Sequence, residues 1–237
     1  MMKKKRLVVF LLATMLFVSF VMSSFAAVNA TEAVEYSSIP LAPADFDTNP
    51  IYTSQFSILK QSRAASAVTS TISVTFLGLC DEEWRAYYGT PAWRREVFDT
   101  LDSAELLMNS QFGIDLDGAV AHFTSPNTST NNGQNVLDAA INASSSFSDW
   151  DIMVAFSGQM HGYGGLANTF NPKYCIIFDQ HSRAANAVSA RHEIGHLYGC
   201  PDHQIPAVSC LMSVPYSNYN NLCSSCYNTW NSNKARH

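Results

Sequence analysis

The chain has 237 residues, a formal net charge of -5 and only 14% charged residues. This length suits one sizeable domain together with processing segments. The sequence holds no basic patch, which excludes nucleic acid as an expected partner, because such partners are bound by clustered lysine and arginine.

The first thirty residues predict a secretory signal peptide. Residues 3–6 are basic, residues 7–21 are almost entirely apolar, and small residues lead to Ala30. This order is typical of a segment that is removed on export. We expect cleavage after Ala30, a secreted chain and no stable membrane association. An uncleaved anchor is the alternative, which the small residues before Ala30 disfavour.

Residues 31–70 are predicted to form a leader or pro-segment ahead of one folded domain, residues 71–237. The leader contains several prolines and little periodic pattern, and Arg63 offers a processing point. An ordinary N-terminal spacer explains the same features equally well. Residues 201–237 hold four of the six cysteines and are expected to form a small irregular subdomain.

Strands and helices are predicted to alternate through the folded domain. Apolar and β-branched runs predict strands over 72–78, 114–123, 151–156 and 174–178, with a short edge strand over 166–170. Apolar residues at helical spacing predict a long helix that begins near Pro91 and ends at Gly113. Further helices are expected over 135–144 and from Ser182 or Asn186 to Gly199. This order predicts an α/β layered domain.

The last of these helices carries the pattern HExxH in His192, Glu193 and His196. Two histidines four residues apart lie on one face of a helix and can bind one metal ion. The glutamate beside the first histidine can reach a water molecule on that metal. Because a five-residue pattern arises by chance in many proteins, further ligands are needed to support the interpretation.

The residues after the helix provide candidates for a third ligand. Gly199 permits the sharp turn that would bring the chain back to the histidines. No glutamate follows Glu193, and Asp202 is the only later carboxylate. The candidates are therefore Asp202, its neighbour His203, His237 and the cysteines.

These residues together resemble the metzincin clan of zinc endopeptidases. The resemblance rests on HExxHxxGxxD, from His192 to Asp202, and on Met212, which matches the clan's Met-turn. An aspartate at the third position, followed by His203, is similar to snapalysin-type secreted bacterial enzymes. The resemblance implies a twisted, mostly parallel five-stranded sheet with an antiparallel edge strand, packed on helices that include the zinc-binding helix.

The resemblance also implies an activity and its residues. The chain is expected to be a secreted, monomeric, zinc-dependent endopeptidase that acts on proteins or peptides. His192, His196 and Asp202 would bind the catalytic Zn²⁺, with His203 as the alternative third ligand. Glu193 would act as general base and acid while a zinc-bound water attacks the peptide bond.

Substrate contacts follow from the same resemblance. In metzincins an edge strand pairs with the extended substrate, which selects Gly165, Leu166 and Ala167 here. Residues after the Met-turn form the wall of the specificity pocket, which selects Pro215 and Tyr216. The competing hypothesis is a secreted, non-catalytic binding or adhesion module that keeps the fold. The intact Glu193 argues against it.

The six cysteines have two interpretations. An even number in an exported chain predicts disulfides, and Cys80 with Cys175 is one expected pair. The alternative is a second, structural zinc, which would resemble the four-cysteine site of archaemetzincins. The residues expected in either arrangement are Cys200, Cys210, Cys223 and Cys226.

Overall fold

The computed structural model describes residues 71–126, 132–159, 161–204, 209–214 and 220–237. The predicted signal peptide and leader, residues 1–70, lie outside the described residues, as do Pro215 and Tyr216. All described residues belong to one unit of the chain, residues 45–237.

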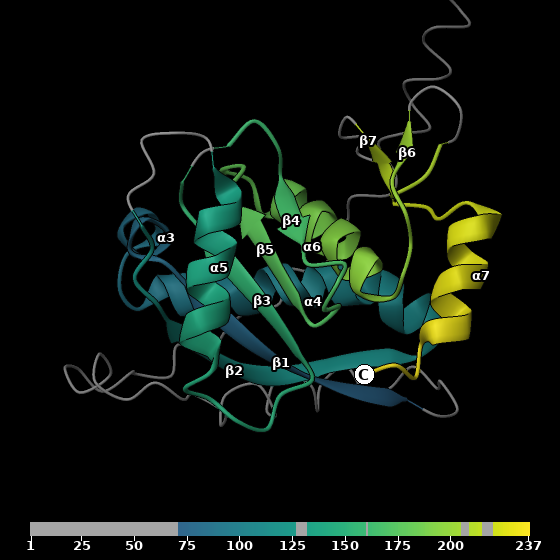
Figure 1. Cartoon of the computed structure of the whole chain (residues 1–237), viewed down its shortest axis with the longest axis horizontal. Helices are drawn as coiled ribbons and strands as arrows, with labels where there is room; N and C mark the ends of the chain where they lie inside the picture. Colours follow the sequence, from purple (N-terminus) through teal and green to yellow (C-terminus); the bar gives the residue numbers. More distant parts are fainter. Residues whose placement is uncertain (1–70, 127–131, 160, 205–208, 215–219) are drawn as a thin grey trace, which may run out of the picture. The chain divides into compact units, whose positions relative to one another are not determined.

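A five-stranded sheet with the strand order β2-β1-β3-β5-β4 lies at the centre of the fold (Figure 1). Strand β1 is parallel to β2 and β3, and β3 is parallel to β5. The edge strand β4 is antiparallel to β5. The predicted mostly parallel sheet with an antiparallel edge strand is therefore confirmed. Its strands are β1 (Ile72–Cys80), β2 (Ile114–His122), β3 (Ile152–Ser157), β4 (Gly165–Ala167) and β5 (Tyr174–Phe178).

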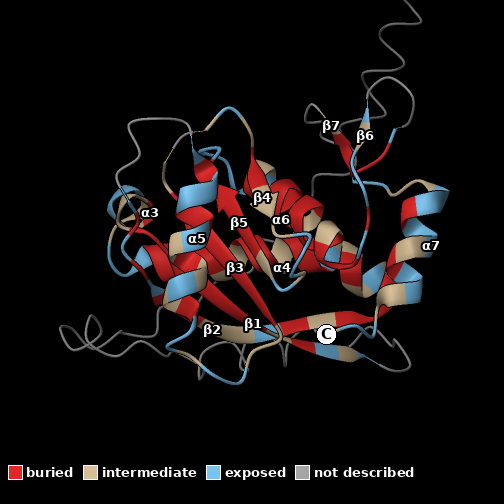
Figure 2. Cartoon of the chain, in the orientation of Figure 1, coloured by how far each residue is buried: buried red, intermediate tan, exposed pale blue. Residues whose placement is uncertain are grey.

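Helices cover both faces of the sheet (Figure 1). Val74 and Phe76 of β1 belong to the core that packs against α4 and α6, whereas Leu77 and Leu79 belong to the core under α5. Strand β3 is buried along its whole length (Figure 2), which explains its continuous apolar sequence. The helices are α3 (Glu82–Tyr88), α4 (Ala92–Phe112), α5 (Gly133–Ser144), α6 (Arg183–Leu197) and α7 (Ser224–Asn233).

The helices α3 and α7 are not among the predicted elements, and α7 lies in the tail for which an irregular structure is expected from the sequence. Asp81 is the N-cap of α3. The Asp81 carboxylate accepts a hydrogen bond of 2.8 Å from the backbone N–H of Trp84, which caps the helix. The same carboxylate accepts hydrogen bonds from the Ser157 hydroxyl and from the Gly158 N–H at the end of β3. A helix of seven residues shows too little periodicity to be predicted, and it is held here by these long-range contacts.

The sheet register separates one pair of cysteines that were expected to form a disulfide. Cys80 ends β1 and Cys175 lies in β5, and β3 runs between these two strands. Two strand spacings amount to about 10 Å, whereas a disulfide needs Cα atoms within about 7 Å. Both residues are free, buried thiols, and no disulfide joins them.

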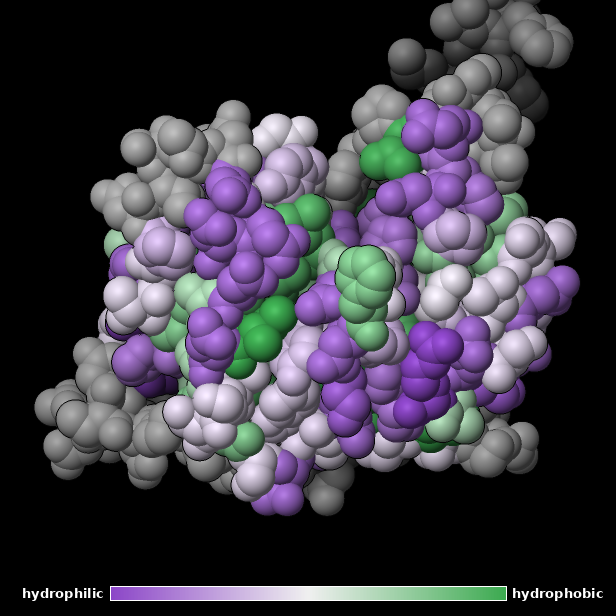
Figure 3. All heavy atoms as spheres, in the orientation of Figure 1, coloured by the Kyte–Doolittle hydropathy of each residue, from purple (hydrophilic) through white to green (hydrophobic). Residues whose placement is uncertain are grey.

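The surface of the described residues is mixed in character. On the face shown in Figure 3, hydrophobic residues occupy small areas between hydrophilic ones. The exposed large hydrophobic side chains lie in separate parts of the chain, such as Leu106 in α4 and Phe170 in the loop between β4 and β5. None of the helices that the structure describes is both long enough and apolar enough to cross a membrane.

Candidate metal centre

Helix α6 is held at both ends. At its start, Arg183 forms ion pairs with Glu96 and Asp99 of α4, at 2.6 and 3.0 Å. At its end, Gly199 adopts a φ of 88° and donates a hydrogen bond of 2.9 Å to the His196 carbonyl. The next N–H, that of Cys200, bonds the carbonyl five residues earlier. This pattern ends a helix and reverses the chain, and glycine makes it possible.

The reversal brings Asp202 back onto the two histidines of α6. Its Oδ1 atom lies 3.2 Å from His192 Nε2 and 3.4 Å from His196 Nε2. The two imidazole rings stand nearly perpendicular, with 4.9 Å between their centroids. These three side chains form a group whose ligand atoms could hold one metal ion.

Backbone carbonyls fix the orientation of both imidazole rings. His192 Nδ1 lies 2.8 Å from the Leu211 carbonyl oxygen, and His196 Nδ1 lies 2.8 Å from that of Cys200. A carbonyl oxygen only accepts, so each Nδ1 carries the hydrogen, and each neutral ring is left with Nε2 as an acceptor. Metal-binding histidines in proteins are oriented in this way.

The donor set fits a small divalent cation. Two imidazole nitrogens and a carboxylate oxygen converge as acceptors, an arrangement that is unfavourable until a positive charge lies between them. Ligand atoms bound at ~2.0–2.1 Å in a tetrahedron are separated by ~3.3 Å. The two measured separations, 3.2 and 3.4 Å, match this value.

The pKa shifts of these residues also indicate that the site favours a positive charge. Burial lowers the pKa of His192 and of His196, but hydrogen bonds to Asp202 and the charge of Glu193 outweigh it, so both pKa values lie above their usual value. When the rings are protonated, Nε2 also carries a hydrogen, and the hydrogen bonds that His192 and His196 then donate hold the pKa of Asp202 well below its usual range. A bound cation would replace the protons that this cluster attracts.

Glu193 lies beside the histidines but is directed to the edge strand. Its exposed fraction is 4%. Burial raises the pKa of Glu193 to about 7, although His192 and His196 act to lower it. A Cβ atom built on Gly165 would lie only 2.5 Å from Glu193 Cγ and 2.8 Å from its Cδ. The glycine in β4 therefore makes room for this carboxylate.

Two more of the predicted substrate residues lie along the same strand, whereas Pro215 and Tyr216 lie outside the described residues. Leu166 and Ala167 are half-buried in β4, which is the last strand in the sheet order. Among the described residues no further strand pairs with the other backbone edge of Gly165–Ala167.

The turn around Met212 packs against α6, the helix that carries both histidines. Met212 is fully buried, and its sulfur lies 2.7 Å from the position that a Cβ on Gly195 would occupy. The preceding carbonyl, of Leu211, orients His192. The Met212 carbonyl accepts a hydrogen bond of 2.7 Å from the His203 N–H. The turn thus packs against the helix and holds the residue that follows Asp202.

Gly195→Ala should destabilise the fold by about 1–3 kcal/mol, since the added methyl group overpacks the contact with Met212. Alanine in a helix interior is otherwise more stable than glycine by roughly 0.5–1 kcal/mol. Urea unfolding of Gly195→Ala, Met212→Ala and the double variant measures the coupling. The double variant should lose less stability than the sum of the single variants. Additive losses would contradict the contact.

The tail residues are arranged differently from the expected group of four cysteines. Cys200 is buried and donates a hydrogen bond of 3.4 Å from its thiol to the Cys226 carbonyl. His203, the alternative third ligand, lies away from His192 and His196, with its Nε2 3.0 Å from Cys226 Sγ. No disulfide joins any of the six cysteines, all of which lie among the described residues.

Several contributors to the metal centre are invisible in the sequence pattern. The Leu211 and Cys200 carbonyls orient the imidazoles through the backbone, which carries no side-chain signature. The need for glycine at position 165 depends on a contact with Glu193, which lies 28 positions later in the chain. For the Leu211 carbonyl the sequence offers one signal, the run Cys210-Leu-Met212, which predicts a tight turn at this position.

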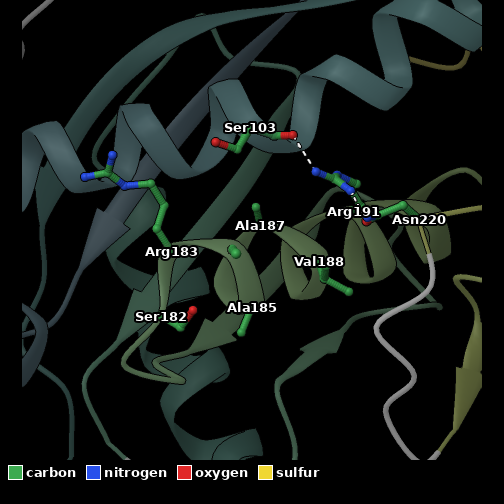
Figure 4. Close-up of a pocket in the computed structure, with 9 residues that line it drawn as sticks. Ser103, Ser182, Arg183, Ala185, Ala187, Val188, Arg191 and Asn220 are labelled. Atoms are coloured by element: carbon green, nitrogen blue, oxygen red, sulfur yellow. Dashed lines mark hydrogen bonds between the residues drawn. The ribbon is translucent and has the colours of Figure 1, made fainter. Parts of the chain in front are cut away.

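A separate pocket of about 600 Å³ lies between α4 and α6 (Figure 4). Its two arginines are already engaged. Arg183 pairs with acidic residues of α4, and Arg191 donates to the Ser103 carbonyl at 2.6 Å and to the Asn220 side chain. None of the metal-centre residues lines the pocket. We interpret it as a gap in the packing between the two helices.

Comparison with known proteins identifies the family of the chain and a solved structure with a similar fold. The family model Reprolysin_5, described as metallo-peptidase family M12, matches residues 69–234. Among solved structures, a chain from a structure of a chaperone-substrate complex is similar, with a TM-score of 0.50 and 14% identity. The match covers 71% of the present chain and 35% of that chain, and at this identity it shows the fold alone. A search of curated proteins finds no match.

Proposed function

This chain belongs to metallopeptidase family M12, and on that premise we propose that it is a zinc-dependent endopeptidase. Membership of the family makes it a peptidase with protein or peptide substrates. The observation that carries the finer proposal is the convergence of His192, His196 and Asp202 beside the buried carboxylate of Glu193. The resemblance to snapalysin-type enzymes stays a prediction.

We assign the metal to the two imidazoles of α6 and to the Asp202 carboxylate. Nitrogen and oxygen ligands of this kind suit zinc, and three protein ligands leave one position open. Bound zinc acidifies a water molecule and polarises the carbonyl group of the substrate. His203 is not needed in this set, since its ring lies against sulfur atoms of the tail.

Glu193 is the group that moves the proton. Its carboxylate takes a proton from the attacking water as the new C–O bond forms at the peptide carbonyl carbon. It then gives the proton to the amine nitrogen as the C–N bond breaks. A buried carboxylate with a pKa raised to about 7 is suited to both halves of this transfer.

The substrate is proposed to lie along β4. An extended peptide can add to the backbone edge of Gly165–Ala167 that does not pair with β5 as a further strand, with main-chain hydrogen bonds that any sequence can make. This places a peptide bond next to Glu193, because Gly165 contacts that side chain. Pro215 and Tyr216 are kept in the proposal as the wall of the specificity pocket.

We also propose that the mature chain is secreted and acts as a monomer. Secretion is supported by the basic, apolar and small-residue order of residues 3–30. A non-catalytic binding module is the second candidate function. It is disfavoured because a binding module gains nothing from a carboxylate that is 4% exposed beside a metal centre, where burial of the charge is costly.

Digestion of a peptide library tests the proposal. Peptides with both ends blocked should be cut at internal bonds by the mature chain, and mass spectrometry of the products gives the positions. The matched control is the double variant His192→Ala/His196→Ala, which should leave the library intact. Release of terminal residues from unblocked peptides alone would contradict the endopeptidase assignment, and an undigested library would favour the binding module.

A further inference from the structure

A second group of ligand atoms lies in the C-terminal tail, apart from the metal centre on α6. It is formed by one atom each from His203, Cys210, Cys223 and Cys226, all within 4.8 Å of one another. His203 Nε2 lies 3.0 Å from Cys226 Sγ and 3.4 Å from Cys223 Sγ. The Cys223 N–H donates to Cys210 Sγ at 3.2 Å. Three sulfurs and one imidazole nitrogen thus face a common point.

We propose that these four residues bind a second, structural zinc ion. Three cysteines with one histidine are a ligand set of structural zinc sites, which are closed by four protein ligands. In a tetrahedral site of this kind a nitrogen and a sulfur ligand are separated by ~3.6 Å, given Zn–N of ~2.0–2.1 Å and Zn–S of ~2.3 Å. The 3.4 Å distance from His203 Nε2 to Cys223 Sγ lies close to this separation, and the 3.0 Å distance to Cys226 Sγ is shorter.

The local structure brings the ligands together from three segments. His203 begins strand β6 (His203–Gln204), which pairs with β7 (Ser213–Val214). Cys210 opens the turn before β7. Cys223 is the N-cap of α7 and Cys226 lies in its first turn, so one short helix supplies two sulfurs.

A disulfide explains the arrangement less completely. It would join two of the three sulfurs and leave one thiol and the imidazole of His203 without a role. An imidazole in contact with two sulfurs is instead the arrangement expected when all of them share a cation. Cys200 is not a member of this group, and its thiol donates to the Cys226 carbonyl instead.

The tail zinc would tie down the segments that complete the first metal centre. His203 directly follows Asp202, and its N–H bonds the Met212 carbonyl. Cys210 directly precedes Leu211, whose carbonyl orients His192. Loss of the tail zinc should therefore weaken metal binding by Asp202 and His192. This consequence rests on the proposed function, whereas binding of the second ion does not.

Cobalt substitution of the full chain is the direct test. The group on α6 offers nitrogen and oxygen ligands only, so a thiolate-to-cobalt charge-transfer band can arise only from the tail site. We expect this band in the wild type, together with binding of two metal equivalents per chain, one for each group. The double variant His192→Ala/His196→Ala should keep the band and lose one equivalent. The test measures absorption and metal content and does not measure peptidase activity. The thiolate band is therefore expected even if the chain is not a peptidase.

Variants of the tail residues identify the ligands. Cys226→Ser and His203→Ala should each lower the metal content by one equivalent, and Cys226→Ser should weaken the thiolate band. Cys80→Ala is the matched control, since Cys80 lies at the end of β1 and belongs to neither group, and it should keep both equivalents and the band. The proposal is overturned if wild-type chain shows no thiolate band. It is also overturned if mass spectrometry without reductant finds the tail sulfurs joined as a disulfide.

Discussion

Replacing Glu193 with glutamine should lower kcat/KM by roughly 10²–10⁴-fold, the contribution typical of a general acid–base group. Glutamine keeps the shape of the side chain but cannot accept a proton from water. The histidines and Asp202 are unchanged, so metal content should equal that of the wild type. The measurement is cleavage of a blocked peptide, alongside metal analysis and thermal unfolding of the same preparation.

Glu83→Gln is the control for this variant. Glu83 lies in α3 and accepts a hydrogen bond of 3.3 Å from the Ser125 hydroxyl, which the oxygen of glutamine can also accept. It should cleave at the wild-type rate. Wild-type cleavage by Glu193→Gln would remove this residue from the mechanism. Loss of metal from that variant would instead assign Glu193 to metal binding.

Gly165→Ala should lower kcat/KM on the order of 10²-fold, the loss that follows a displacement of about 1 Å in a catalytic group. A Cβ at this position would lie 2.5 Å from Glu193 Cγ and 2.7 Å from the Ile176 carbonyl oxygen. The clash with the Ile176 carbonyl shifts β4, and the clash with Cγ displaces the Glu193 side chain. Metal content should not change, because neither contact involves a ligand.

Gly162→Ala provides a matched control, because a Cβ at Gly162 meets no heavy atom within 4 Å. It should keep both the stability and the kcat/KM of the wild type. If Gly165→Ala cleaves peptides at the wild-type rate, the contact between β4 and Glu193 has no part in catalysis. If it loses metal, the displacement reaches the histidines as well.

The sheet and the long helices could be predicted because their signals are local. The apolar run at 174–178 predicts β5 with its observed bounds, and the spacing of apolar residues predicts α4 close to its observed position. The helices α3 and α7 are short and depend on contacts made far along the chain. Asp81, for example, caps α3 while also holding the end of β3.

The candidate metal centre was predictable as far as its ligands follow one another in sequence. His192, Glu193, His196 and the turn at Gly199 are all local features. The choice between Asp202 and His203 could not be made from sequence, because a shift of one residue in a loop exchanges the two side chains. In the structure, Asp202 faces the histidines of α6 and His203 faces the sulfurs of the tail.

The ligands of the tail group could not be chosen from the sequence either. Four cysteines near the C-terminus suggested a group composed of themselves alone. The chain fold replaces Cys200 with His203, because the turn after Gly199 directs the Cys200 thiol to a backbone carbonyl. The number and spacing of cysteines do not show where each side chain points in the folded chain.

Removal and return of the metal test the central claim most directly. The purified chain is freed of metal with a chelator, the loss is verified by metal analysis, and cleavage of a blocked peptide is followed while zinc is added back. We predict that cleavage disappears with the metal, returns with zinc in the wild type, and does not return in His192→Ala/His196→Ala. Undiminished cleavage by a chain shown to be free of metal would contradict the account.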